Sequence, residues 1–122
     1  MHKTRESVIA DGVRSLQKNT QPGVLSCVTF RDDNHEHWLK YDSRNSLNFD
    51  WPFSREPDSS FELSYLTPLI SWRKLAWNAD ISASYQVTSR HPDTLARVID
   101  SIFTRLYELP KEHAISWTMD GD

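Results

Sequence analysis

The stretch SLNFDWPF, residues 46–53, decides the fold class of this chain. Large apolar side chains alternate strictly with polar side chains or proline along it. Such alternation is typical of a β-strand that turns one face to a core and the other to solvent. Pro52 has no N–H to donate to a neighbouring strand, so it belongs near the strand end or on a sheet edge. The apolar positions are Leu47, Phe49, Trp51 and Phe53.

Two further strands are predicted on the N-terminal side of this stretch. Residues 24–30 are rich in β-branched and aromatic side chains, a composition that favours a strand. Residues 37–41 alternate again, with Leu39 and Tyr41 on one face. Short polar turns join these consecutive strands, and that arrangement predicts an antiparallel meander. The turns are residues 31–34 and 42–45.

Two helices are predicted on either side of this meander. Residues 4–18 repeat apolar side chains at helical spacing. Gly12 weakens that helix by about 1 kcal/mol relative to alanine, so the helix needs packing against the rest of the chain. Ser59 and Glu62 have the spacing of a capping box, and a second helix is expected over residues 57–68.

Two more strands follow the second helix. Residues 69–77 fit either a strand or a continued helix, and the break expected at Pro68 favours the strand. Residues 81–88 alternate clearly, with Ile81 and Tyr85 among the apolar positions.

The third helix is expected to begin at Pro92 and to end at Pro110. Ile115 and Trp117 beyond it are expected to pack against the body, and residues 119–122 to fray. A continuous apolar stripe runs along the helix, which predicts burial of one face. The stripe contains Leu95, Val98, Ile99, Ile102, Phe103 and Leu106.

These elements predict an α+β fold in the order α-β-β-β-α-β-β-α. An antiparallel sheet of about five strands is expected, with helices covering mainly one of its faces. The length of 122 residues fits a single domain, residues 1–122, in which residues 110–122 form a partly flexible C-terminal extension.

Composition narrows the classes of partner. The net charge is −3 and no basic stripe is present, so nucleic acid is not expected as a partner. The single cysteine, Cys27, excludes an intrachain disulfide and favours a reducing compartment. Residues 1–14 contain no apolar h-region, so no signal peptide is expected. No stretch has the roughly 18 apolar residues that a membrane span needs. A cytoplasmic protein without a membrane partner is therefore expected.

The sequence contains no recognisable catalytic motif and no motif for a cofactor. With three glycines it cannot build a Gly-rich phosphate loop. A cluster over residues 32–37 holds carboxylates and imidazoles, but it lies where a polar turn is expected, so we interpret it as a turn and predict no metal site. Cys27 lies within an apolar strand and is expected to be buried and inert.

The aromatic content is high for this length and is the best indication of a partner surface. Five Trp, five Phe and four Tyr residues are present, and aromatic side chains dominate binding interfaces. The conservative interpretation is that most of them fill the core. The candidate partner-binding residues lie on elements with apolar side chains on more than one side, and they are Trp38, Phe53, Phe61, Tyr65, Trp72 and Trp77.

This chain resembles the class I type III secretion chaperones and the related YbjN and TY-Chap families in its order of elements, its excess of acidic residues and its length. An aromatic strand, a Leu-rich helix leading to Leu-Gly-Trp and an amphipathic last helix characterise those families. Lys40 stands where they have Gln, and Ala76 where they have Gly. The corresponding stretches are residues 38–41, residues 63–66 leading to 75–77, and residues 95–106.

This resemblance implies a bacterial, non-enzymatic protein that dimerises and binds an extended segment of another protein. It carries over no individual functional residue. We therefore expect a chaperone-like or adaptor-like protein-binding module that forms a homodimer.

Two alternatives remain open. An immunity protein could neutralise a basic toxin through an acidic face, and Asp32, Asp33 and Glu36 would be the nucleus of that face. An enzyme or a small-molecule binder could assemble its site from residues scattered along the chain. A pocket with His91 or His113 beside a carboxylate would favour this second alternative.

Overall fold

The alternating stretch of residues 46–53 forms the middle of a six-stranded antiparallel sheet. In this computed structural model, residues 4–19, 21–34, 36–54, 72–109 and 114–120 are described. The helical elements are α1 (Arg5–Asn19), α3 (Pro92–Ser101) and the π-helical turn η2 (Ile102–Leu106) that continues α3. The strands are β1 (Cys27–Asp32), β2 (Trp38–Asp42), β3 (Ser46–Asp50), β4 (Trp72–Asn78), β5 (Ser82–Val87) and β6 (Ile115–Asp120).

The described strands lie in the order β4-β5-β3-β2-β1-β6. Every pairing in this order is antiparallel. β1, β2 and β3 follow one another through tight turns, as the meander predicts. β5 pairs with β3, and β6 closes the opposite side of the sheet against β1, so β4 and β6 are the two outer strands.

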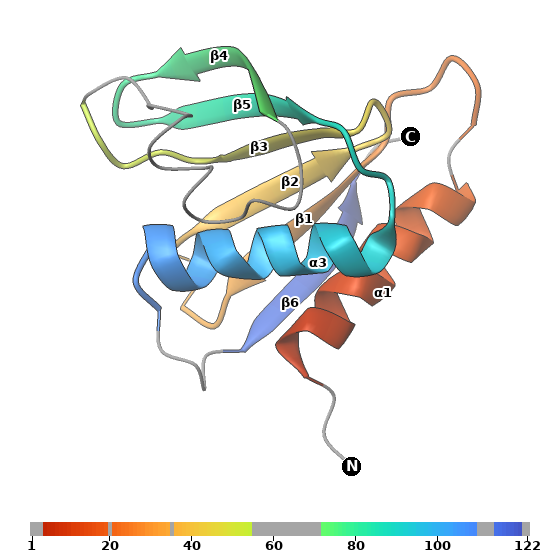
Figure 1. Cartoon of the computed structure of the whole chain (residues 1–122), viewed down its shortest axis with the longest axis horizontal. Helices are drawn as coiled ribbons and strands as arrows, with labels where there is room; N and C mark the ends of the chain where they lie inside the picture. The colour runs from red at the N-terminus through yellow and green to blue at the C-terminus, as the bar shows by residue number, and fades with distance from the viewer. Residues whose placement is uncertain (1–3, 20, 35, 55–71, 110–113, 121–122) are drawn as a thin grey trace.

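α1 and α3 both lie on one face of the sheet (Figure 1). The strand register places the apolar residues of neighbouring strands opposite one another on that face: Phe30 pairs with Leu39, and Leu39 with Phe49. All three side chains are fully buried. The apolar stripe of α3 packs against the same core. The alternation in the sequence is therefore explained by a sheet with one covered face.

The fold class is as predicted, and most strand positions are close to those expected. Leu39 and Tyr41 point into the core, and the segment 69–77, which the sequence left undecided, forms a strand over Trp72–Asn78. β1 begins three residues later than expected and runs through Arg31 and Asp32, which were predicted as a turn. β3 ends at Asp50, before the proline at position 52. The predicted second helix lies outside the described residues.

The C-terminal extension differs from the prediction. Residues 115–120 form β6, a sixth strand that pairs along the whole of β1. Fraying was expected from residue 119 onward, which is wrong for Met119 and Asp120, because they pair with Val28 and Cys27. The expectation that Ile115 and Trp117 pack against the body is confirmed. β6 is short, and its pairing partner is distant in sequence, so local patterning does not reveal it.

The close packing of α1 explains the glycine in its interior. A Cβ atom at Gly12 would lie 2.8 Å from Cε1 of Phe30 and 3.1 Å from Cγ of Trp117. Phe30 belongs to β1 and Trp117 to β6, so the missing side chain lets α1 approach these two strands. An ion pair between Arg14 and Asp93, with Nη2 and Oδ1 3.0 Å apart, joins α1 to α3.

We predict that Gly12→Ala destabilises the protein, although alanine is the better helix former by about 1 kcal/mol. Overpacking a core costs about 1–3 kcal/mol, and the Phe30 ring is fully buried and has little room to move. The free energy of unfolding, measured by urea denaturation, should fall by up to about 2 kcal/mol on balance. Lys18→Ala, at an exposed position of the same helix, is the control and should change it by less than about 0.5 kcal/mol. A more stable Gly12→Ala variant would contradict this packing.

Candidate functional site

The sheet face away from the helices is polar. Thr29, Lys40 and Asn48 lie side by side across β1, β2 and β3, and Ser84 continues the row on β5. Thr29 is fully buried even on this face, because neighbouring side chains cover it. The ammonium of Lys40 lies 5.9 Å from the ring centroid of Trp38. This face is therefore polar, the side chains of this row are half-buried or buried, and the face includes the half-buried indole of Trp38.

The structure separates the predicted partner-binding residues. Trp38 is half-buried on the polar face. Phe53 and Trp77 are partly buried and pack against the core. Trp72 begins β4 opposite Val87. Phe61 and Tyr65 lie outside the described residues. Trp38 therefore lies on the sheet face opposite the core against which Phe53 and Trp77 pack, and the binding role of all six residues stays a prediction.

The large apolar side chains that are exposed among the described residues are aliphatic or methionine. Ile81 is 62% exposed and Leu75 48% exposed, and both belong to the β4–β5 hairpin. Leu25 and Met119 are the other two exposed large apolar residues in the described ranges. Ile81 was expected inside the core because it continues the alternation of β5. It lies instead in the turn before that strand, where its N–H bonds to the carbonyl oxygen of Asn78.

The polar cluster at residues 32–37 serves the fold. Asp32 is only 1% exposed, and its Oδ1 accepts a hydrogen bond from the backbone N–H of His37 at 2.9 Å. An acidic binding face at this turn would therefore lack Asp32, with Asp33 and Glu36 still exposed. Oδ2 of Asp33 accepts a hydrogen bond from the backbone N–H of Ala114, which ties the turn to the start of β6.

His37 takes part in a compact arrangement with Asp50 and Tyr107. Its Nδ1 lies 2.8 Å from Oδ2 of Asp50, and its ring stacks on that of Tyr107 with the centroids 4.2 Å apart. The Tyr107 hydroxyl donates to the backbone carbonyl of Asp50. Burial raises the pKa of Tyr107 well above its usual value, and the charges of Asp50 and Asp32 add to that effect. A neutral Tyr107 thus joins the end of α3–η2 to β3.

The residues that the structure describes give little indication of a metal site or of a reactive cysteine. No three His, Cys, Asp or Glu side chains among them are grouped as a metal ion would need. Cys27 was expected to be buried, but it is half-buried at the start of β1. His91 is the exposed residue that precedes α3, and His113 lies outside the described ranges.

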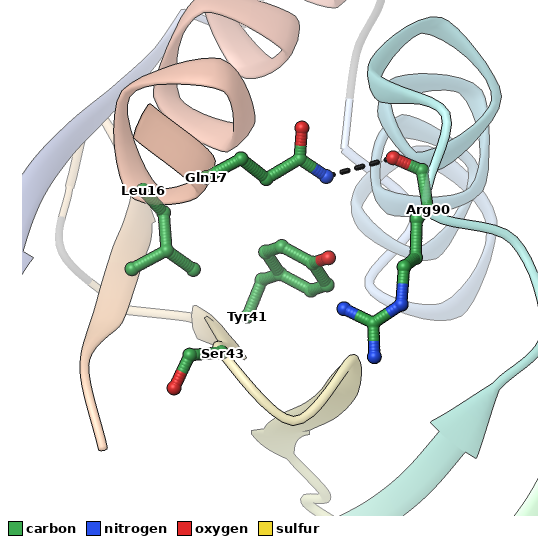
Figure 2. A pocket seen from close by; sticks show the side chains of 5 residues that line it. All are labelled: Leu16, Gln17, Tyr41, Ser43 and Arg90. Atoms are coloured by element: carbon green, nitrogen blue, oxygen red, sulfur yellow. Dashed lines mark hydrogen bonds between the residues drawn. The ribbon is translucent and has the colours of Figure 1, made fainter. Parts of the chain in front are cut away.

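A pocket of about 280 Å³ opens between the end of α1, the end of β2 and the start of α3 (Figure 2). The ring of Tyr41 forms its floor, between Gln17 of α1 and the side chain of Arg90 (Figure 2). Nε2 of Gln17 donates a hydrogen bond of 2.7 Å to the backbone carbonyl of Arg90. The pocket is also lined by Leu16 and Ser43.

A buried hydrogen-bond chain holds the floor of this pocket in place. The Tyr41 hydroxyl donates to Oδ1 of Asn45 at 2.7 Å, and Nδ2 of Asn45 donates to the carbonyl of Val87 at 2.7 Å. Burial raises the pKa of Tyr41, while a hydrogen bond from Gln17 and the charge of Arg90 oppose that shift. Tyr41 therefore remains a neutral phenol at physiological pH and donates this hydrogen bond.

Asn45 joins the turn after β2 to the end of β5. It adopts a φ of 63°, a conformation that asparagine tolerates better than most residues. Its backbone carbonyl accepts a hydrogen bond from the N–H of Val87. The sequence predicted a turn here, but it could not show that the Asn45 side chain spans two strands, because Val87 is distant in the chain.

Comparison of this chain with protein-family models, with curated proteins and with solved structures finds no match. The fold and its pocket therefore define the chain only as an α+β protein with a one-sided antiparallel sheet. None of the helices in the described ranges is long and apolar enough to cross a membrane.

We predict that Asn45→Gly lowers the free energy of unfolding by about 2–3 kcal/mol. Glycine also adopts the left-handed backbone conformation, so the loss of stability reflects the two buried side-chain hydrogen bonds of Asn45. Chemical denaturation measures this free energy of unfolding. Arg44→Gly, at the exposed neighbouring position, is the control, and an equal loss in both variants would show that turn flexibility causes the effect and that the Asn45 side chain does not.

Proposed function

We propose that the protein is a non-enzymatic protein-binding module, chaperone-like or adaptor-like, that binds an extended segment of a partner protein along the outer edge of β4. The observation that carries the proposal is the exposure of this outer strand. β4 ends the order of the described strands, and every side chain from Arg73 to Ala76 is exposed. An outer strand presents backbone N–H and C=O groups that can pair with an extended peptide.

Exposed apolar side chains on the same hairpin support this surface. Leu75 and Ile81 are the two most exposed large apolar residues of the hairpin. Backbone pairing supplies affinity for any extended peptide, whereas apolar anchors beside the edge select its sequence. Trp72 and Trp77, two of the predicted contact residues, belong to this strand.

The edge also has features that limit indiscriminate pairing. Arg73 and Lys74 place positive charges on it, and the register of β4 shifts between Lys74 and Ala76. Charged side chains and bulges are the usual means by which outer strands avoid aggregation. A partner segment with acidic side chains would compensate these charges, so the edge favours an acidic extended segment.

The order of the described elements supports the chaperone-like reading. A helix, three meander strands, two further strands and a helix follow one another in the described ranges, while the second helix that the resemblance implies falls outside those ranges. β6 is an addition to that order. A homodimer is part of the proposal, because an outer strand can also pair with the same strand of a second copy about a two-fold axis.

Site-specific photo-crosslinking in the cells that the protein comes from tests this proposal. A photoreactive residue replaces Leu75 or Ile81 in turn. Ser116, exposed on β6 at the opposite edge of the sheet, is the control position. We expect discrete adducts with another protein or a second copy from positions 75 and 81 and none from position 116, because Leu75 and Ile81 are the most exposed large apolar side chains of the β4–β5 hairpin.

Light scattering on the purified protein separates the two kinds of adduct. A self-adduct together with a dimeric mass identifies the homodimer, and a monomeric mass with a heterologous adduct identifies a partner protein. Equal adducts from all three positions, or none from positions 75 and 81, would contradict binding at β4.

A further inference from the structure

The pocket at Tyr41 continues into a second cavity. This cavity has a volume of about 310 Å³ and shares Ser43 with the first pocket. Its walls are the loop of residues 21–25 and the side chain of Arg44. The two cavities therefore adjoin at Ser43, and we call this pair of cavities the groove. Its size is that of a small-molecule site.

The groove is positively charged although the chain as a whole is acidic. Arg90 lines one cavity and Arg44 the other, and no described lining residue is Asp or Glu. Neither guanidinium forms an ion pair with a residue that the structure describes. The neighbouring carboxylate of Asp42 is turned into the turn itself, where Oδ1 accepts the backbone N–H groups of Arg44 and Ser46.

The remaining polar groups of the pocket are already oriented. The Tyr41 hydroxyl is committed to Asn45, so its ring serves as an apolar wall. The hydroxyl oxygen of Ser43 accepts a hydrogen bond from the backbone N–H of Ser26 at 3.2 Å, which leaves its own proton to donate. The Arg90 side chain extends toward the Ser43 turn along the edge of the Tyr41 ring (Figure 2). The Arg90 guanidinium lies on one side of the Tyr41 side chain and Ser43 on the other, so the two donors face different parts of the cavity (Figure 2).

We propose that this groove binds a small organic anion. One carboxylate or phosphate group contacts the guanidinium of Arg90, and the Tyr41 ring packs against the carbon skeleton of the ligand. Guanidinium groups form strong charge-assisted hydrogen bonds with both kinds of anion. A second anionic group on the ligand reaches Arg44 in the adjoining cavity. The preferred ligand therefore carries two negative charges on a short chain.

This site is separate from the β4 edge. β4 and the strand pair β2–β1 lie on opposite sides of β3 and β5 in the sheet order. Anion binding therefore does not depend on the proposed function, and either could fail without the other. The site belongs to the class of small-molecule binder that the sequence left open, but it uses Arg90 and Arg44, not a histidine beside a carboxylate.

Titration of the isotope-labelled protein with succinate, acetate, inorganic phosphate and the neutral analogue succinamide, followed by NMR, tests the proposal. Succinate is expected to shift the backbone amides of Ser43 and Arg90 and to bind more tightly than acetate. Arg90→Gln should weaken succinate and phosphate binding by about tenfold or more. The fold should persist in this variant, because Gln17 bonds to the backbone carbonyl of Arg90 and not to its side chain.

Two further variants make the test specific. Arg97→Gln removes another exposed arginine of α3, one that lies near Glu6 and Asp93, and should leave binding unchanged. Arg44→Gln should weaken succinate while leaving acetate unaffected, since acetate has only one charge. The relative strength of succinate and phosphate identifies which anion the pocket prefers.

Three results would overturn the proposal. Succinamide could bind as tightly as succinate, Arg97→Gln could lose as much affinity as Arg90→Gln, or no anion could shift the Ser43 and Arg90 amides. Crosslinking from position 75 in the Arg90→Gln variant is expected to be unchanged, so a failure here is distinguishable from a failure of the proposed function.

Discussion

The packing of α1 and α3 on a single face of the sheet determines the rest of this structure. Gly12 lets α1 approach the strands closely enough for Phe30 to be fully buried beneath it. Both helices bury their apolar sides in the same hydrophobic core, so one core accounts for most of the large apolar side chains described. The polar sheet face and the β4 edge lie away from these helices, whereas the Arg90 pocket forms where the end of α1 meets the start of α3.

The two candidate surfaces lie at different margins of this core. The β4–β5 hairpin extends past the helices and carries exposed apolar side chains beside a strand edge (Figure 1). The Arg90 groove forms where the end of α1 meets the start of α3 over the turn after β2. The first surface suits an extended peptide, and the second suits a small anion.

The sequence predicts the features that local periodicity determines. It does not predict those that depend on contacts between segments far apart in the chain. Alternation alone places Leu39 in the core, because every second strand residue faces the helices. The same rule fails at Ile81, which continues the alternation but lies in a turn that the described helices do not cover. β6 escapes prediction because its stability comes from pairing with β1. Arg90 and Ser43 look unremarkable along the chain, and only folding brings them together to line one pocket.

Amide hydrogen exchange on the purified protein tests the central claim, that the helices protect the middle of the sheet while the edge of β4 stays open. Amides of Phe30, Leu39 and Phe49 are predicted to exchange only through global unfolding. Every second amide of β4 points away from β5 and is predicted to exchange rapidly. Protection of those outward amides equal to that of the central strands would contradict the account, because it would show that the chain itself already occupies the edge.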